Sequence, residues 1–227
     1  MAISAAELGR QGQPTERVGI LGGTFDPVHV GHLQVAQQFR AHLGLDRVLL
    51  VPCGVPVHRA PPQASNEQRC RMLELACQDE LWLEVDRREV DSPDPSWTHA
   101  TLSSLRQELP SSALYFLMGA DAFLGLPTWK RWEELPSLAH LIVSTRPGYQ
   151  LDVESLSEPL ASFCQRHLVE RREELRARLA GHVYLAELQT APVSSSEVRA
   201  RIKQCEALGD FLSPAVAAYI VEQQLYL

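Results

Sequence analysis

The feature that most constrains this chain is a regular alternation of short apolar runs with segments whose apolar residues recur at helical spacing. The runs begin at Val18 and are bounded by glycine, proline or polar residues. They cover residues 18–21, 48–51, 81–85, 114–118, 141–143 and 183–185. Strands that alternate with helices need crossover connections, which produce a largely parallel sheet. We therefore expect a single sheet of about six strands.

Boundary signals mark the helices between and after these runs. Ser65 with Gln68 three residues later forms a capping box, the pattern that opens many helices. Ser194 and Ser213 precede two further helical patterns, which predicts a pair of helices within residues 190–227. The whole pattern predicts an α/β, Rossmann-like, doubly wound fold with a helical pair after the sheet.

The chain divides simply along its length. Residues 1–16 are small and polar, which predicts a flexible N-terminal lead, and residues 17–227 are expected to form one domain. Residues 150–181 break the alternation. Arginine and glutamate are crowded between Arg166 and Arg178, which predicts a charged, solvated helical insertion.

Composition excludes several classes of protein. The chain of 227 residues is 45% hydrophobic, its mean hydropathy is −0.14, and it has no apolar run long enough to cross a membrane. The first residues lack the apolar stretch of a signal peptide, so we expect a cytoplasmic protein without a membrane partner. Five cysteines without a CxxC pair argue against a disulfide framework or a zinc knuckle.

The formal net charge is −7, which argues against a general nucleic-acid surface. It leaves open an anionic small-molecule substrate, because a pocket can be locally basic within an acidic protein. In an open parallel sheet, ligands bind beyond the carboxyl ends of the strands where the strand order reverses. The segments that follow Leu21, Val51, Val85, Met118 and Val143 are therefore the places where we expect a site.

One of these segments carries the most distinctive stretch of the chain, GGTFDPVHVGH at residues 22–32. It lacks the spacing of a P-loop or of a dinucleotide-binding glycine loop. It still joins a strand to a helix, where bare glycine backbone can approach a phosphate closely. His29 and His32 share one helix face, and no nearby cysteine or carboxylate completes a standard zinc spacing. We therefore expect a phosphate at this turn and no metal bound by the protein.

At this point the sequence resembles a known family. Thr24-Phe25-Asp26-Pro27-Val28-His29-Val30-Gly31-His32 looks like the T/HxGH signature of the nucleotidyltransferase superfamily, and the full string is similar to the opening of bacterial nicotinate-nucleotide adenylyltransferases. Further matches follow in the order found in that family. They are Pro95-Ser96-Trp97-Thr98, Gly119-Ala120-Asp121, Pro127-Thr128-Trp129, Arg146-Pro147-Gly148-Tyr149 and Val193-Ser194-Ser195-Ser196-Glu197-Val198-Arg199.

The resemblance implies transfer of the adenylyl group of ATP to nicotinate mononucleotide, with Mg²⁺ arriving on ATP, and it leaves a homo-oligomer open. Three residues are then the expected catalytic set: His29, His32 and Arg199. The residues expected at the ATP phosphates are Gly22, Gly23, Thr24, Phe25, Ser195 and Ser196. The residues expected to meet the acceptor are His58, Arg59, Trp97, Thr98, Asp121, Trp129 and Arg146.

Simpler structural roles compete with several of these assignments. A lone tryptophan is more often a core residue than a stacking platform, although the position of Trp129 beyond a strand favours stacking on a pyridine ring. Asp121 and Thr98 could cap helices. The chain also departs from the family pattern, with Val57 in place of a proline and Trp97 in place of a tyrosine.

Other functions remain open from the residues alone. A relative could adenylylate nicotinamide mononucleotide or phosphopantetheine, although the latter would lack the P-T-W and R-P-G-Y matches. An aminoacyl-tRNA synthetase would carry a KMSKS loop, which is absent from this sequence. A nucleotide-binding regulatory module is a fourth reading, and it predicts loss of a phosphate-binding residue.

Overall fold

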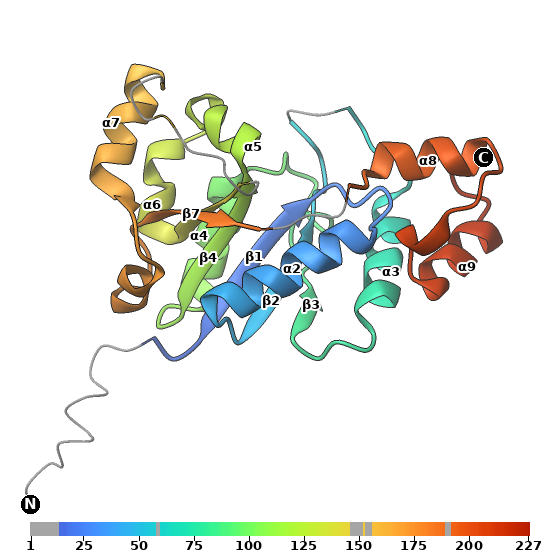
Figure 1. Cartoon of the computed structure of the whole chain (residues 1–227), viewed down its shortest axis with the longest axis horizontal. Helices are drawn as coiled ribbons and strands as arrows, with labels where there is room; N and C mark the ends of the chain where they lie inside the picture. The colour runs from blue at the N-terminus through green and yellow to red at the C-terminus, as the bar shows by residue number, and fades with distance from the viewer. Residues whose placement is uncertain (1–13, 58–59, 146–151, 153–155, 189–191) are drawn as a thin grey trace, which may run out of the picture.

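The computed structural model describes residues 14–57, 60–145, 152, 156–188 and 192–227 (Figure 1). Three residues expected at the acceptor, His58, Arg59 and Arg146, lie outside the described residues. Most of the expected N-terminal lead lies outside them as well.

The described chain is built on one parallel sheet of seven strands in the order β3-β2-β1-β4-β5-β7-β6. The strands are β1 (Arg17–Gly23), β2 (Arg47–Pro52), β3 (Leu83–Val85), β4 (Ala113–Gly119), β5 (His140–Thr145), β6 (Leu168–Val169) and β7 (Val183–Glu187). The parallel α/β fold is confirmed. The expected number of strands was one too low, because β6 has only two residues and its sequence carries no strand periodicity of its own.

Helices cover both faces of the sheet. They are α2 (Val30–Leu43), α3 (Asn66–Cys77), α4 (Thr98–Glu108), α5 (Ala120–Leu124), α6 (Leu135–Leu138), α7 (Glu158–His167), α8 (Ser195–Lys203) and α9 (Pro214–Glu222). Short 3₁₀ turns are η1 (Leu126–Thr128), η2 (Trp132–Glu134), η4 (Arg172–Ala177) and η5 (Gly209–Phe211). Figure 1 shows α2 lying along β1, α9 beside α3, and α4, α6 and α7 gathered at the other end of the molecule.

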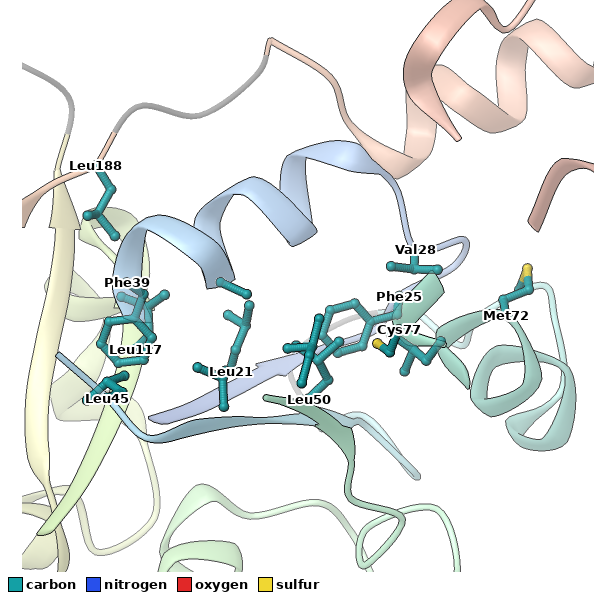
Figure 2. Packing of buried hydrophobic residues seen from close by; sticks show 14 of the residues in the cluster. Leu21, Phe25, Val28, Phe39, Leu45, Leu50, Met72, Cys77, Leu117 and Leu188 are labelled. Carbon is teal, nitrogen blue, oxygen red and sulfur yellow. The ribbon is translucent and has the colours of Figure 1, made fainter. Parts of the chain in front are cut away.

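Two apolar cores explain why the strands are apolar on both sides. In β4, Tyr115 and Leu117 pack into the core that also holds residues of α2, α3, α8 and α9. Leu114, Phe116 and Met118 of β4 face the opposite core, with residues of α4, α6 and α7. Figure 2 shows Phe39 of α2 beside Leu45 and Leu117 in the first core. Alternate strand residues thus serve opposite faces, as expected of a doubly wound sheet.

The helix starts follow the sequence signals. The Ser65 hydroxyl accepts a hydrogen bond of 3.2 Å from the backbone N–H of Gln68, and the Gln68 side chain accepts from Ser65 in return. The hydroxyls of Ser194 and Ser213 cap α8 and α9 by accepting from the backbone N–H groups of Glu197 and Val216. The helical pair after the sheet is therefore confirmed.

The charged segment before β7 differs from its expectation. A single solvated helix through Arg166–Arg178 is wrong, because α7 ends at His167 and the next two residues pair with β7 as β6. The following charges lie on η4, whose Leu175 is buried in the first core. Main-chain pairing at the sheet edge outweighs local helix preference here. No helix in the described part of the chain is long and apolar enough to cross a membrane.

Candidate active site

The strand order reverses between β1 and β4, and the expected site residues gather at the carboxyl ends of these strands. β1 pairs with β2 on one side and with β4 on the other. The strands that follow β1 are therefore added toward one edge of the sheet, and those that follow β4 toward the other edge. Gly22 and Gly23 still pair with Val51 and Pro52 at the end of β1. The glycine turn therefore starts directly at the switch point of the sheet, where such folds bind ligands.

The turn after Gly23 is tightly built. A side chain at Gly23 would place its Cβ 2.9 Å from the ring of Phe25, so only glycine leaves room for this packing. Phe25 itself is buried and has a φ of 50°, a left-handed conformation unusual for a residue with a side chain. The carbonyl oxygen of Thr24 accepts a hydrogen bond from Arg69 of α3. The Phe25 side chain thus anchors the turn in the first core and does not face a ligand.

The paired imidazoles lie together at the start of α2. The ring centroids of His29 and His32 are 3.8 Å apart, and His32 Nδ1 accepts a hydrogen bond of 3.2 Å from the backbone N–H of His29. Gly31 permits this arrangement, because a Cβ there would lie 3.0 Å from His29 Nδ1. The glycine between the two histidines is therefore a packing requirement of the pair.

Burial sets the charge of one ring. The side chain of His29 is largely buried, and this burial lowers its pKa to about 4. At neutral pH the ring is uncharged and offers one N–H donor, which suits a phosphate oxygen without adding a full positive charge. Its Nδ1 has no hydrogen-bond partner among the described residues.

Helix α8 brings the late serine–arginine motif to the same turn. The Ser195 hydroxyl donates a hydrogen bond of 2.9 Å to the carbonyl oxygen of Pro27. Arg199 donates from Nη1 to the carbonyl oxygen of Asp26 at 2.6 Å and from Nη2 to the hydroxyl of Ser196 at 3.3 Å. The glycine turn, the two imidazoles and α8 therefore form one cluster, although the segments are far apart in sequence.

A cavity of about 680 Å³ opens beside this cluster along the carboxyl ends of β1, β4 and β5. Its lining includes six of the expected site residues: Gly22, Gly23, Thr24, Thr98, Asp121 and Trp129. The expected residues Trp97, His29, His32, Ser195, Ser196 and Arg199 do not line it. Most of the expected site residues thus fall into a cavity and an adjoining polar cluster, whereas Phe25 packs in the first core and Trp97 belongs to neither.

The competing structural roles can now be compared with the geometry. Trp129 is half-buried, its ring meets Phe116 edge-on at 6.4 Å, and it also forms part of the cavity wall. Thr98 is the first residue of α4, which is capped at Trp97, so Thr98 is not the cap. Asp121 lies one position inside α5, whose cap is Gly119. All three face the cavity.

Sequence reasoning missed two charged groups that build this edge. Arg69 is fully buried and donates to the carbonyl oxygens of Thr24 and Cys53 at 2.7 and 2.6 Å, which joins the loops after β1 and β2. Burial lowers its pKa from the ordinary value. Glu89 lines the cavity and accepts a hydrogen bond of 2.6 Å from the hydroxyl of Thr101. The sequence signal for Arg69 was its place on the apolar face of the predicted helix that became α3. The sequence held no such signal for Glu89.

Glu89 belongs to a contact between two loops that wall the cavity. Burial raises its pKa, against the opposing effect of hydrogen bonds from Thr101 and Ser96. The Ser96 hydroxyl accepts from the backbone N–H of Gly54 at 3.0 Å. A Cβ on Gly54 would lie 2.0 Å from the carbonyl oxygen of Glu89, so the loops touch backbone to backbone. In the part of the chain that the structure describes, no group of three or more His, Cys, Asp or Glu side chains is placed to hold a metal ion.

A glycine turn, paired imidazoles and a late helix at the switch point of a parallel sheet define a nucleotide-binding α/β protein. Residues 20–201 match the family model described as Cytidylyltransferase-like. A probable nicotinate-nucleotide adenylyltransferase of Aeromonas hydrophila is 44% identical over 209 residues, which cover 92% of this chain and 96% of the relative. A probable nicotinate-nucleotide adenylyltransferase of Klebsiella pneumoniae strain 342 is 40% identical over 213 residues, which cover 93% of this chain and 98% of the relative. The chain therefore belongs to the cytidylyltransferase-like family and, within it, to the nicotinate-nucleotide adenylyltransferases.

Solved structures give the same fold. The nicotinic acid mononucleotide adenylyltransferase of Plasmodium falciparum complexed with NaAD has a TM-score of 0.68 at 18% identity, with 93% of this chain and 97% of that chain covered. The same enzyme complexed with APC has a TM-score of 0.66 at the same coverage. At this identity the likeness supports the fold alone.

Proposed function

We propose that this chain transfers the adenylyl group of ATP to nicotinate mononucleotide and releases pyrophosphate, forming nicotinate adenine dinucleotide. The observation that carries the proposal is the meeting of the glycine turn, the imidazole pair and the α8 motif around Asp26 and Pro27. The names of the curated relatives support the same substrates.

The chemistry fits the groups present. An acceptor phosphate oxygen attacks the α-phosphorus of ATP, the new P–O bond forms in line with the bond that breaks, and pyrophosphate leaves with the bonding electrons. The attacking phosphate is already anionic, so no general base is required. Positioning alone can contribute about 7–11 kcal/mol to such a step, and a well-aimed donor about 3 kcal/mol.

Each part of the cluster has a proposed role in this step. The backbone of Gly22, Gly23 and Thr24 approaches the ATP phosphates, and the neutral His29 ring donates to the α-phosphoryl group while His32 supports it. Arg199 neutralises charge on the leaving pyrophosphate. The donors are ring and backbone N–H groups, a hydroxyl and a guanidinium, which suit phosphate oxygens. Mg²⁺ bound to ATP supplies further neutralisation when it is present.

The adjoining cavity is proposed to receive the mononucleotide. Trp129 offers a flat ring for the pyridine, and Asp121 can accept hydrogen bonds from ribose hydroxyls. The start of α4 at Thr98 offers backbone N–H groups, which favour a carboxylate over a neutral amide. This arrangement is the structural argument for nicotinate over nicotinamide.

The test is pyrophosphate release with ATP·Mg²⁺ and either mononucleotide in parallel. We expect the acid to be used at least tenfold more efficiently than the amide. His29→Ala should lower kcat about a hundredfold or more, because a lost phosphate donor acts in the transition state. A preference for the amide, or a His29→Ala variant that binds ATP and turns over like wild type, would contradict the proposal.

A further inference from the structure

Asp26 is a buried carboxylate at the centre of the phosphate-facing cluster. Only 4% of its surface is exposed. Its Oδ2 accepts a hydrogen bond of 2.8 Å from the backbone N–H of Gln63, and its Oδ1 accepts one of 3.0 Å from that of Ala64. A carboxylate removed from water in this way depends on hydrogen-bond donors to offset the cost of its desolvation.

A second donor to Oδ1 comes from the far end of the sequence. The hydroxyl of Tyr226, in the segment that follows α9, donates to Asp26 Oδ1 at 2.8 Å. Tyr226 is 9% exposed and packs in the first core, with a φ of 66°. Burial and the neighbouring Asp26 both raise the pKa of Tyr226, which keeps the hydroxyl protonated as a donor.

The same aspartate holds Arg199 by a different atom. Arg199 Nη1 donates to the carbonyl oxygen of Asp26 at 2.6 Å, and it lies 3.7 Å from the carboxylate Oδ2. The guanidinium is therefore hydrogen-bonded to the main chain, while its ion pair with the carboxylate is long and not hydrogen-bonded. This geometry leaves part of its positive charge available to another anion.

We propose that Tyr226 is a positioning residue for Arg199, acting through Asp26, and that it keeps the guanidinium directed at the leaving phosphates of ATP. The inference rests on the proposed function, in which Arg199 meets those phosphates. With the Tyr226 hydroxyl in place, the Asp26 carboxylate accepts from three neutral donors, and Arg199 stays 3.7 Å from it.

Loss of the hydroxyl removes one of the two donors to Oδ1. A buried carboxylate that has lost a donor is stabilised more strongly by the nearest cation, which is Arg199. The carboxylate then turns toward the guanidinium, and the ion pair competes with the phosphates for the same N–H groups. ATP binding weakens while the mononucleotide cavity is left unchanged.

The first experiment compares Tyr226→Phe with wild type. We expect the KM for ATP and the Kd for ATP·Mg²⁺ alone, measured by calorimetry, to rise about tenfold, since a hydrogen bond to a charged group is lost. The KM for the mononucleotide should change less than twofold. Tyr219→Phe on α9 removes a hydroxyl from the same region and should leave all three constants unchanged. An equal rise in both KM values, or no change in ATP binding, would overturn the proposal.

A double-mutant cycle separates this role from simple stabilisation. In an Arg199→Lys background, Tyr226→Phe should weaken ATP binding less than twofold, because the planar guanidinium it positions is gone. Additive effects of the two substitutions would refute the coupling. Failure of the proposed function would give a different result, because the wild type would then release no pyrophosphate with nicotinate mononucleotide. The ATP titration would still measure the effect of Tyr226 on ATP binding.

Discussion

The guanidinium of Arg69 donates a hydrogen bond of 2.7 Å to the carbonyl oxygen of Thr24, and this contact fixes α3 to the turn behind β1. A second N–H of the same side chain reaches Cys53 after β2, and Asn66 accepts a third bond at 2.6 Å. One buried cation therefore holds together the two loops from which the phosphate-facing turn and one cavity wall arise.

Arg69→Met should destabilise the protein strongly. The substitution leaves two loop carbonyls and the Asn66 side chain without their buried donor, and we expect the free energy of unfolding to fall by about 3 kcal/mol. Urea unfolding followed by circular dichroism measures this. Arg71→Met is the matched control, because Arg71 lies on the exposed side of the same helix and forms a surface ion pair with Glu74. Its loss should change stability by less than about 1 kcal/mol.

Gly31→Ala tests the packing of the imidazole pair. Alanine favours the helix, but its Cβ would lie 3.0 Å from His29 Nδ1 and 3.1 Å from Val193, so the ring must move. We expect kcat to fall between tenfold and a hundredfold, since small displacements of a positioned group have effects of that order. Gln34→Ala on the exposed side of α2 should leave kcat unchanged. An active Gly31→Ala enzyme would show that His29 has no precise position to keep.

The stability of the protein should fall in mild acid. Burial lowers the pKa of His140 to about 4 from its ordinary value of 6.5. The unfolded chain therefore takes up a proton near pH 6.5, whereas the folded protein resists it until about pH 4, and folding is favoured less as pH falls through this window. The loss approaches about 3 kcal/mol for this side chain.

Urea unfolding at several pH values measures this effect through the slope of the free energy of unfolding against pH. His29 contributes in the same direction, because burial also lowers its pKa to about 4. His140→Asn should reduce the slope between pH 6.5 and 4 by about one proton, whatever its effect on stability at pH 7. A variant with the slope of wild type would show that His140 is not the group responsible.

Trp129→Phe tests the cavity wall. A smaller ring stacks less strongly on a pyridine, and removal of base stacking by alanine substitution typically loses about 1–3 kcal/mol. We expect Trp129→Phe to raise the KM for the mononucleotide severalfold and Trp129→Ala to raise it about tenfold or more, with the KM for ATP unchanged. Trp82→Phe is the control, because Trp82 packs against the first core and does not line the cavity. A rise in the KM for ATP with no change in that for the mononucleotide would show that ATP, and not the acceptor, occupies this cavity.

The sheet and the phosphate-facing motif were predictable because their signals are local. Leu114–Met118 is apolar at every position, as a strand covered on both faces must be, and residues 22–32 carry their own turn and helix-start chemistry. The two-residue strand β6 was not predictable, since Leu168 and Val169 form a strand only because β7 lies beside them. The local charges around them favoured a helix.

What the sequence determined was the set of strands, the capped helices and the family motif, all of which depend on neighbours within a few residues. The tertiary structure decided which of these meet. Asp26 and Tyr226 are 200 positions apart, and their hydrogen bond exists only because the chain folds back so that α9 packs against α3. Trp129 likewise became part of a cavity wall through the position of η1 beyond β4. Spacing along the chain cannot predict such contacts, because they depend on how the two apolar cores orient whole elements.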